Sequence, residues 1–477
     1  MTTRNSDELL STYDDAPLNR RYWTTYSILT VGISLDYFDF FIVAFLIAVV
    51  GPQWHMTYGQ SSMILLAGGV GGIVGALVCG SLGDVWGRKA ILVICSFICA
   101  AAAGAIALIP DGSVVMFTIL RFVVGFALGG TVTPFNTLLV ETTPTRYRTV
   151  LSSLGVVFPT VGGVLAGLAS ATLMGAIGWR GVAALGIAPA VIGLLAIFLM
   201  PESVRWLIAR GRFIEARNEV AKLHGVPAES LPLPTTAAVA PPRGRLADLY
   251  AQPRLFWLVL ISWLGISTAE YAILLWGPTI FSMLLKIPVM QAAHYMVYLS
   301  LFGIFGKIIF SFVAHWLGRR TCGMLAGFAG AVALAAAAYF HSLVLAGFPI
   351  FVLLVMAAFL FVDGSFANIA PYSVEAYGVR LGSRASGFGQ AVNSIGRIIG
   401  PLCLALIAGT SNLLAPAATE AAVLPTFLFL AACVFAVGLV FTFLAPETRG
   451  MPISQGDEEP AAGSAAGSLG LAKQPLA

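Results

Sequence analysis

The chain has 477 residues, of which 58% are hydrophobic and 10% charged, and its mean hydropathy is +0.90. A soluble domain of this length could not keep so little charge and stay in solution. Composition therefore indicates an integral membrane protein and excludes a soluble globular one. The formal net charge of +4 says less than the placement of the charges along the chain.

Twelve apolar stretches follow one another along the sequence. In bilayer hydrocarbon each spanning segment must satisfy its own backbone, so each stretch of about 20 apolar residues predicts a helix. We expect an all-α membrane protein with twelve transmembrane helices. The predicted spans are 24–49, 58–82, 90–110, 114–138, 150–174, 180–200, 254–282, 291–314, 321–340, 346–370, 384–408 and 424–445.

Three polar segments flank and divide these spans. Residues 1–21 are polar and acidic, so they are interpreted as a cytoplasmic tail and not as a cleaved signal peptide. Segment 201–253 is basic, and its part RWLIARGRFIEARNEVAKLHG predicts an amphipathic helix on the membrane surface. Residues 446–477 are rich in Ala, Gly and Ser and predict a largely disordered cytoplasmic tail.

The basic residues set the predicted topology. Most of the 26 Lys and Arg residues fall on the side of the predicted membrane that carries the N-terminus. This positive-inside bias predicts that both termini are cytoplasmic in a multi-pass protein of the cell inner membrane. The sequence has no GxxxxGK[ST] loop, and its His and Cys residues lack metal-ligand spacing. We therefore expect no ATP site, no metal and no cofactor apart from protons as the coupling ion.

The two halves of the chain repeat each other. Three pairs of motifs recur in the same order at nearly equal separations, which predicts two pseudo-symmetric six-helix bundles, 22–200 and 254–445, around a central cavity. The pairs are GDVWGRKA with HWLGRRTC, VETTPTR with VEAYGVR, and PESVR with PETRG.

At this point the sequence resembles the major facilitator superfamily over residues 22–450. The motif GSLGDVWGRK (Gly80–Lys89) closely follows the loop that marks this superfamily. The second copy has His315 where the family often has Asp. The resemblance implies a secondary transporter that works by alternating access.

Paired acids in the first span predict the proton site. Asp36 and Asp39 lie three residues apart and so share a helix face, where both cannot ionise cheaply in a low dielectric. Arg121 in the fourth span is the expected counter-ion, and an acid that exchanges Arg121 for a proton would link protonation to conformation. The alternative is a permanent Asp–Arg pair that only joins the two spans. LDYFD and NSIGRIIGP resemble the first-helix and eleventh-helix motifs of the aromatic acid:H+ symporters, and the metabolite:H+ symporters have a similar first helix. PESVRWLIARGR resembles a segment that these acid symporters share with sugar porters.

Arg397 in the eleventh span is the predicted substrate anchor, because a guanidinium fork binds a carboxylate through two parallel hydrogen bonds. The alternative is a structural bridge from Arg397 to Glu270 or Asp363, two other intramembrane acids. Lys307 is a further intramembrane charge, and charge at that depth requires a partner or a role. The aromatic and amide side chains expected at the cavity are Tyr37, Phe38, Tyr271, Trp276, Asn136, Asn368, Gln390 and Asn393.

The loop motifs predict a charged gate at the cytoplasmic ends of the spans. Such a network would hold that side shut in the outward-facing state. The alternative is that these residues only determine topology, which does not explain the matched acids Glu141 and Glu375. The predicted gate residues are Gly83, Asp84, Gly87, Arg88, Glu141, Arg146, Arg148, Arg319, Arg320, Glu375 and Arg380.

The function that best fits this pattern is proton-coupled symport of a small organic anion, an aromatic or other metabolite carboxylate. The alternatives are a sugar or polyol porter or an exporter of the same fold, and a non-transporting membrane receptor. No Ser-His-Asp or metal constellation is visible, so we expect no enzyme. The expected partners are the substrate, protons and the lipid bilayer, and we expect a monomer that binds no nucleic acid.

Overall fold

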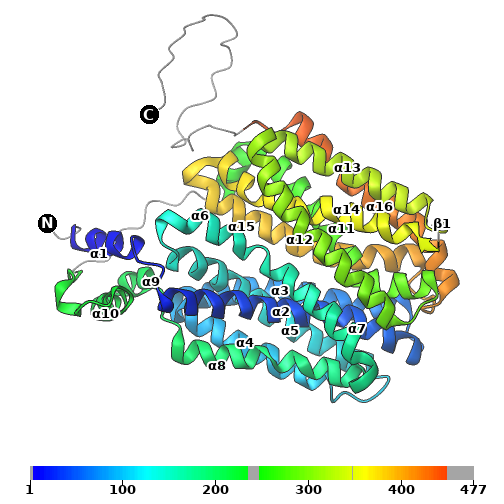
Figure 1. The fold of residues 1–477 in the computed structure, drawn as a ribbon, viewed down its shortest axis with the longest axis horizontal. Helices are drawn as coiled ribbons and strands as arrows, with labels where there is room; N and C mark the ends of the chain where they lie inside the picture. Colours follow the sequence, from blue (N-terminus) through cyan, green and yellow to red (C-terminus); the bar gives the residue numbers. More distant parts are fainter. Residues whose placement is uncertain (1–3, 235–245, 346, 448–477) are drawn as a thin grey trace, which may run out of the picture.

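The computed structural model describes residues 4–234, 246–345 and 347–447, and most of them are helical. Long helices lie side by side in a bundle (Figure 1). These helices are α2 (Arg20–Gln53), α3 (Tyr58–Trp86), α4 (Arg88–Ile106), α5 (Val114–Thr142), α7 (Phe158–Ala184), α8 (Pro189–Leu199), α11 (Pro253–Leu285), α12 (Val289–Leu317), α13 (Arg319–Tyr339), α14 (Ile350–Gly364), α15 (Phe366–Ala408) and α16 (Pro416–Phe443). The shorter elements are α1 (Arg4–Asp14), α6 (Thr145–Gly155), α9 (Val204–Ala209), α10 (Phe213–His224), η1 (Leu185–Ile187), η2 (Ala228–Ser230), η3 (Leu246–Ala251) and the antiparallel pair β1 (Val344–Leu345) and β2 (Phe348–Pro349).

Eleven helical segments in the described part of the chain are long and apolar enough to cross a membrane. One of them, Phe158–Leu199, has 42 residues, which as a straight helix would be about 63 Å long, twice the thickness of bilayer hydrocarbon. Its backbone turns at Gly178, where φ is 67° and ψ is 178°. This segment therefore supplies the fifth and sixth crossings, and the twelve-helix fold is confirmed.

Two predicted boundaries are corrected by the structure. The fifth span begins at Phe158 instead of residue 150, because α6 is a separate helix that ends at Gly155. The loop expected between the tenth and eleventh spans is absent from the described backbone. There α15 continues from the tenth span through Arg384 into the eleventh.

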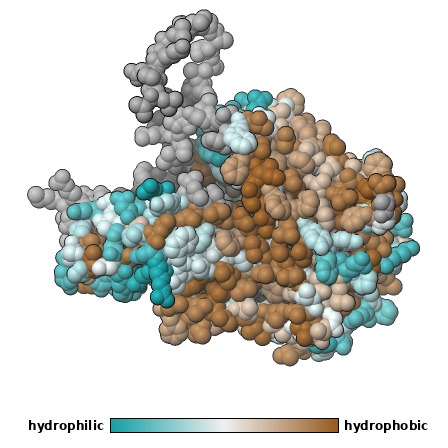
Figure 2. Space-filling view, viewed as in Figure 1, coloured by the Kyte–Doolittle hydropathy of each residue, from teal (hydrophilic) through white to brown (hydrophobic). Residues whose placement is uncertain are grey.

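An apolar band runs around the middle of the bundle. Figure 2 shows hydrophobic surface over the centre and hydrophilic surface toward both ends. Large apolar side chains such as Leu77, Phe198 and Val332 are more than two-thirds exposed. Exposed apolar surface of this extent is stable only in contact with lipid. The protein is a multi-pass membrane protein.

Helices of the first half pack mainly on one another, and so do those of the second half. Within the first half α3 packs on α5 and α2 on α7, and within the second half α11 packs on α15 and α13 on α16. The main contacts between the halves are made by α7 with α12, α3 with α15, and α2 with α11. Each of these pairs has one helix from each half.

Helices α1, α9 and α10 form a small cluster at one end of the bundle, which we call the tail end, and β1 marks the opposite end (Figure 1). Tyr13 of α1 packs with Trp206 of α9 and Val220 of α10, and burial raises the pKa of the Tyr13 hydroxyl. The prediction of a single amphipathic helix is therefore wrong in two respects. The segment is interrupted at Gly211, where φ is 73°, and α1 covers its apolar face.

The opposite end is closed by hydrogen bonds between the two halves. Residues 56–59 of the first half pair with residues 410–414 of the second, and we call this contact the seam. The amide of Tyr58 donates to the carbonyl of Asn412 at 2.9 Å, and the amide of Gly59 donates to the carbonyl of Thr410 at 2.9 Å. The amide of Leu414 donates to the carbonyl of Met56 at 3.1 Å.

Glycines let α3 and α5 touch through their backbones. A Cβ atom at Gly125 would lie 2.0 Å from the carbonyl oxygen of Gly68, and one at Gly75 would lie 1.9 Å from the carbonyl oxygen of Phe126. Small residues at such spacing allow close helix approach in membranes, where van der Waals packing drives association. The contact holds α5, and with it Arg121, close to the helices that face the cavity.

We expect Gly125→Val to separate α3 from α5, because no rotamer removes a Cβ atom from a neighbouring carbonyl. The expected loss of stability is about 1–3 kcal/mol or more, measured as the thermal unfolding midpoint of the detergent-purified protein. The matched control is Gly80→Ala on α3, whose Cβ atom would lie an ordinary 3.7 Å from Thr133. Equal midpoints for the two variants would contradict this account.

Candidate functional site

A buried ion pair joins α2 to α5. The Nη1 atom of Arg121 lies 3.5 Å from Oδ2 of Asp39 and donates to the carbonyl of Asp39 at 2.9 Å. Its Nη2 atom donates to the carbonyl of Phe40 at 3.0 Å. Both side chains are about 2% exposed. Two of the three bonds are to carbonyl groups, so Arg121 keeps partners even when the carboxylate is neutral.

Asp36 lies one helical turn before Asp39 and has a different environment. It is 1% exposed, and neither carboxyl oxygen accepts a hydrogen bond of ordinary geometry from the described residues. Its polar neighbours include Asp39 and the side chain of Thr131. An ionised carboxylate in such a place is costly, because nothing compensates its lost hydration. The geometry favours a neutral, protonated Asp36 beside a charged Asp39.

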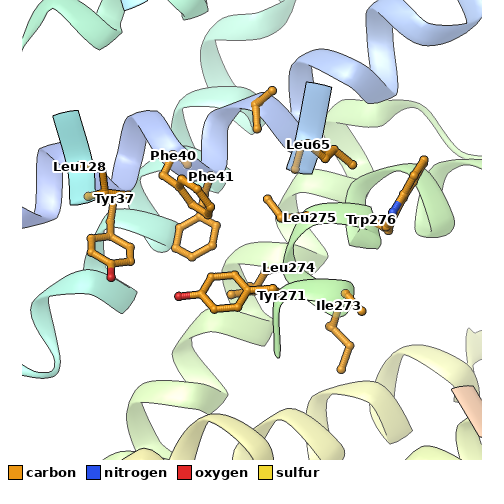
Figure 3. Close-up of a cluster of buried hydrophobic side chains, with 14 of the residues drawn as sticks. Tyr37, Phe40, Phe41, Leu65, Leu128, Tyr271, Ile273, Leu274, Leu275 and Trp276 are labelled. Carbon is orange, nitrogen blue, oxygen red and sulfur yellow. The ribbon is translucent and has the colours of Figure 1, made fainter. Parts of the chain in front are cut away.

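Arg397 lies among three aromatic rings at the junction of the halves. Its Cζ atom is 5.5 Å from the ring centre of Tyr37, 5.4 Å from that of Phe40 and 5.0 Å from that of Tyr271. Its Nη2 atom donates to the hydroxyl of Tyr37 at 2.7 Å. Figure 3 shows the rings of Tyr37 and Tyr271 with their hydroxyl groups on the same side of the cluster. Cation–π contacts of this kind favour a guanidinium group held away from water.

The proposed bridge from Arg397 to an acid is not formed. Among the described residues, no carboxylate lies within ion-pair distance of Arg397, and Asp363 pairs instead with Lys307 at 2.9 Å. The hydroxyl of Thr160, from the first half, accepts a hydrogen bond from Lys307 and lies 3.5 Å from Asp363. Glu270 is 8% exposed and contacts the carboxyl group of Asp363. A polar cluster therefore crosses the interface between α7 of the first half and α12 of the second.

These groups surround a cavity of about 120 Å³ between the halves. Most of the predicted substrate residues line it, namely Tyr37, Asn136, Glu270, Tyr271, Asp363, Gln390 and Asn393. Arg397 is not a lining residue, but it contacts the lining side chains of Tyr37 and Tyr271. The lining residues that the sequence prediction missed or left undecided include Phe41, Phe135, Thr160, Trp263, Ser300 and Lys307.

Three predicted lining residues lie elsewhere. The indole N–H of Trp276 donates to the carbonyl of Pro401 at 2.9 Å, and its ring packs on Tyr58, far across the cluster from Tyr37 (Figure 3). The amide of Asn368 donates to the carbonyl of Arg319 at 2.9 Å near the tail end. Phe38 is part of the apolar core. Each was predicted to line the cavity from its residue type alone. Residue type does not determine how deep a side chain lies in the bundle or which face of its helix it occupies.

The loop motifs organise the start of α4 and of α13. Gly87 precedes α4 with φ 104°, and Gly318 precedes α13 with φ 89°. The carboxylate of Glu202 accepts hydrogen bonds from the amides of Arg88 and Lys89, at 3.1 and 3.2 Å. Carboxylates at helix N-termini satisfy free amides and interact favourably with the helix dipole.

The second half repeats this arrangement. Glu447 accepts hydrogen bonds from the amides of Arg319 and Arg320, at 2.9 and 3.2 Å. The guanidinium of Arg319 also forms two hydrogen bonds to Glu375, at 3.2 and 2.8 Å. Glu202 and Glu447 were quoted in the repeated motifs, but their role as caps was not foreseen. The signal was an acid directly after the sixth and the twelfth span.

The predicted gate charges make their contacts within their own halves. Arg88 lies 3.7 Å from Asp84 and 3.9 Å from Glu141, beside Gly83. Glu141 accepts a hydrogen bond from Ser203. Arg148 pairs with Asp14 of α1 at 2.8 Å.

Arg146 takes no part in these pairs; it is exposed and stacks over Tyr147. The side chain of Arg380 lies outside the described residues. Since the described gate contacts do not cross between the halves, a latch function remains a prediction.

The sequence profile of the sugar (and other) transporter family matches residues 11–459. The chain belongs to this family, within the major facilitator superfamily. It is a transporter and not an enzyme.

Two curated relatives illustrate the similarity. The niacin transporter of Acinetobacter baylyi is 29% identical over 406 residues, which is 83% of this chain and 89% of the relative. The 4-hydroxybenzoate transporter of the same organism is 31% identical over 213 residues, 44% of this chain and 46% of the relative. The second match therefore spans about half of each protein.

Solved structures agree on the fold. A crystal structure of a D-xylose–proton symporter superposes with a TM-score of 0.67 and covers 90% of this chain and 99% of the symporter chain. The sequence identity of that pair is 16%, so the comparison shows the fold alone.

We expect the two acids of α2 to differ in their effect on stability. Asp39→Asn removes the charge that pairs with Arg121 and leaves a buried guanidinium without a counter-ion, at a cost of about 3–5 kcal/mol. Asp36→Asn replaces a group without a cationic partner, so the thermal unfolding midpoint of the purified protein should change little. A larger loss for Asp36→Asn than for Asp39→Asn would contradict the assignment of the neutral acid.

Proposed function

We propose that this transporter takes up a small aromatic carboxylate together with protons. The observation that carries the proposal is the position of Arg397, which is buried, surrounded by aromatic rings and without an acidic partner among the described residues. A buried positive charge with no counter-ion is costly. A carboxylate ligand would supply that counter-ion through two parallel hydrogen bonds.

The surrounding side chains fit an aromatic ligand. Tyr37 and Tyr271 contact both Arg397 and the cavity, so a carboxylate on the guanidinium would bring its ring against theirs. Asn136, Gln390 and Asn393 are available to bind ring substituents. The names of three relatives support this class of ligand, namely the niacin and 4-hydroxybenzoate transporters and a gallate transporter of Pseudomonas putida, 30% identical over 50% of this chain.

The acids of α2 supply the proton site of the proposal. Asp39 holds Arg121 when ionised, and Arg121 retains two carbonyl partners when Asp39 is neutral. Asp36, without a partner, is suited to exchange its proton with the neighbouring acid. Protonation thereby changes a helix–helix contact between α2 and α5, which couples the proton to conformation. Protons are the coupling ion in this proposal, and the monomer needs no other cofactor.

The described conformation fits one state of an alternating-access cycle. The seam closes the opposite end, while the cavity lies between the seam and the tail end, where Trp263 and Gln390 line it. We infer that the tail end, with both chain termini, faces the cytoplasm of a bacterial inner membrane, as the basic loops favour. In the reverse state the seam opens and the charges around Arg88 and Arg319 close the tail end.

Transport into proteoliposomes tests the proposal. With the inside alkaline, we expect uptake of labelled nicotinate, 4-hydroxybenzoate or gallate to rise at least tenfold over uptake without a pH gradient. Xylose is included because the family also contains sugar porters, and we expect no pH-driven uptake of it. Symport would be refuted if the pH gradient changed the uptake of none of these acids. pH-driven uptake of xylose would favour the sugar-porter alternative.

The same assay examines the anchor. Arg397→Gln should lower acid uptake at least tenfold, and Arg397→Lys, which keeps the charge but loses the planar fork, should restore only part of it. The matched control is Arg254→Gln, at the start of α11, whose guanidinium bonds the carbonyls of Leu444 and Phe443 among the described residues. Full acid uptake by Arg397→Gln would refute the anchor.

Asp36→Asn separates proton coupling from substrate binding. A neutral amide cannot exchange a proton, so net uptake driven by a pH gradient should be lost. Exchange of labelled for unlabelled substrate across the membrane needs no net proton movement and should persist. Loss of both activities in a variant that binds substrate normally would show that Asp36 is not a specific proton carrier.

A further inference from the structure

In the described part of the chain, each half holds a buried acid that forms no ion pair beside a second acid that forms one. In the first half these are Asp36 and the Asp39–Arg121 pair. In the second half they are Glu270 and the Asp363–Lys307 pair. Asp36 and Glu270 are separated along the chain by the same number of residues as Glu141 and Glu375, the acids of the repeated loop motif. The two groups therefore occupy equivalent positions in α2 and α11.

Glu270 and Asp363 together form a place where a proton can bind. Both acids line the cavity, and they interact with each other there. An ionised carboxylate can only accept hydrogen bonds, so a bond between two of them forms only when one carries a proton. Asp363 is held as the charged member by Lys307 at 2.9 Å. Glu270 is then the member that can take up a proton, and it lines the cavity, where water can deliver it.

The charges that face Glu270 come from three packed helices and from its own. They are Asp363 of α14, Lys307 of α12 and Arg397 of α15, with Tyr271 adjacent on α11. With Glu270 ionised, the negative charges of Glu270 and Asp363 balance the positive charges of Lys307 and Arg397. A bound carboxylate adds one negative charge that the buried cluster cannot hold without several kcal/mol of cost. Uptake of one proton by Glu270 restores neutrality when the anion is bound.

We propose that Glu270 is a second proton carrier, loaded together with the substrate anion, so that two protons accompany each monoanion. In the loaded state a carboxyl oxygen of Glu270 has taken a proton from hydronium in the cavity, and Arg397 binds the anion. On release the O–H bond of Glu270 breaks, the proton passes to water, and ionised Glu270 again balances Arg397. The first-half acids carry the other proton, as in the proposed function on which this inference rests.

The cluster is also placed to sense the movement of the halves. Thr160 belongs to α7 of the first half, yet its hydroxyl contacts both Lys307 and Asp363 of the second. Separation of α7 from α12 would remove that hydroxyl from the ion pair. The affinity of the second-half cluster for a proton would then differ between the two conformations, which is what a coupling ion requires.

Charge movement distinguishes two protons from one. Two protons with one monoanion carry one net positive charge inward, whereas one proton with one monoanion carries none. In proteoliposomes with 4-hydroxybenzoate or nicotinate, a potential of about 59 mV, inside negative, should raise wild-type accumulation about tenfold. In Glu270→Gln the potential should have no effect, and one pH unit should raise accumulation about tenfold instead of about a hundredfold. The control is Glu420→Gln, an exposed acid of α16, which should behave as wild type.

The outcomes are separable. Wild-type accumulation that does not respond to the potential would refute the second proton, and so would an unchanged response in Glu270→Gln. No pH-driven uptake of either acid by the wild type would refute the proposed function, and this inference with it.

Should Glu270→Gln not transport, proton binding can be followed in detergent by calorimetry of ligand binding in buffers of different ionisation enthalpy. We expect uptake of about one proton per bound 4-hydroxybenzoate or nicotinate in the wild type and none in Glu270→Gln. Equal proton uptake by both proteins would overturn the assignment. A thermal unfolding midpoint close to that of the wild type shows that the variant is folded.

Discussion

Charge buried in a low-dielectric interior must be neutralised nearby, and the centre of this protein is arranged around that constraint. Among the described residues, four acids and three bases are buried inside the bundle, and they form local sets. Asp39 is matched by Arg121, and Asp363 by Lys307. Arg397 has aromatic rings in place of a carboxylate. Asp36 and Glu270 are left over, and an unmatched acid in such surroundings stays neutral only by binding a proton. Binding of an anion at Arg397 and protonation of an unmatched acid therefore both reduce the uncompensated charge in the interior.

Contacts within a half differ in kind from contacts between halves. The α3–α5 pair is held by backbone-to-backbone packing at Gly68, Gly75 and Gly125. The two helices cannot separate without losing many close contacts. The interface between the halves is held by individual hydrogen bonds, by edge-to-face contacts between aromatic rings and by the seam. Such contacts are modest individually and can be exchanged for water. Each half can therefore move as a unit while the interface changes.

The sequence predicted the features that depend on composition and local pattern. The apolar stretches gave the twelve spans, and the charges in them identified Asp36, Asp39 and Arg121, since an ionisable residue in a span is rare. Depth and helix face are set by tertiary packing, so Trp276 and Asn368 were misplaced although their residue types suit a cavity. The turn at Gly178 and the bond between Thr160 and Lys307 could not be foreseen, because each depends on how two distant helices cross. The capping role of Glu202 was accessible in principle, as the matching acid Glu447 follows the equivalent span.

The seam joins main-chain atoms, and this has an evolutionary consequence. Hydrogen bonds from the amides of Tyr58, Gly59 and Leu414 do not depend on which side chains these positions carry. Gly59 itself is restricted sterically, because a Cβ atom there would lie 2.8 Å from the carbonyl oxygen of Thr410. Selection can thus alter most of both loops without losing the closure. A gate of this kind leaves almost no trace in the amino-acid sequence, and two transporters with unrelated loops can share it.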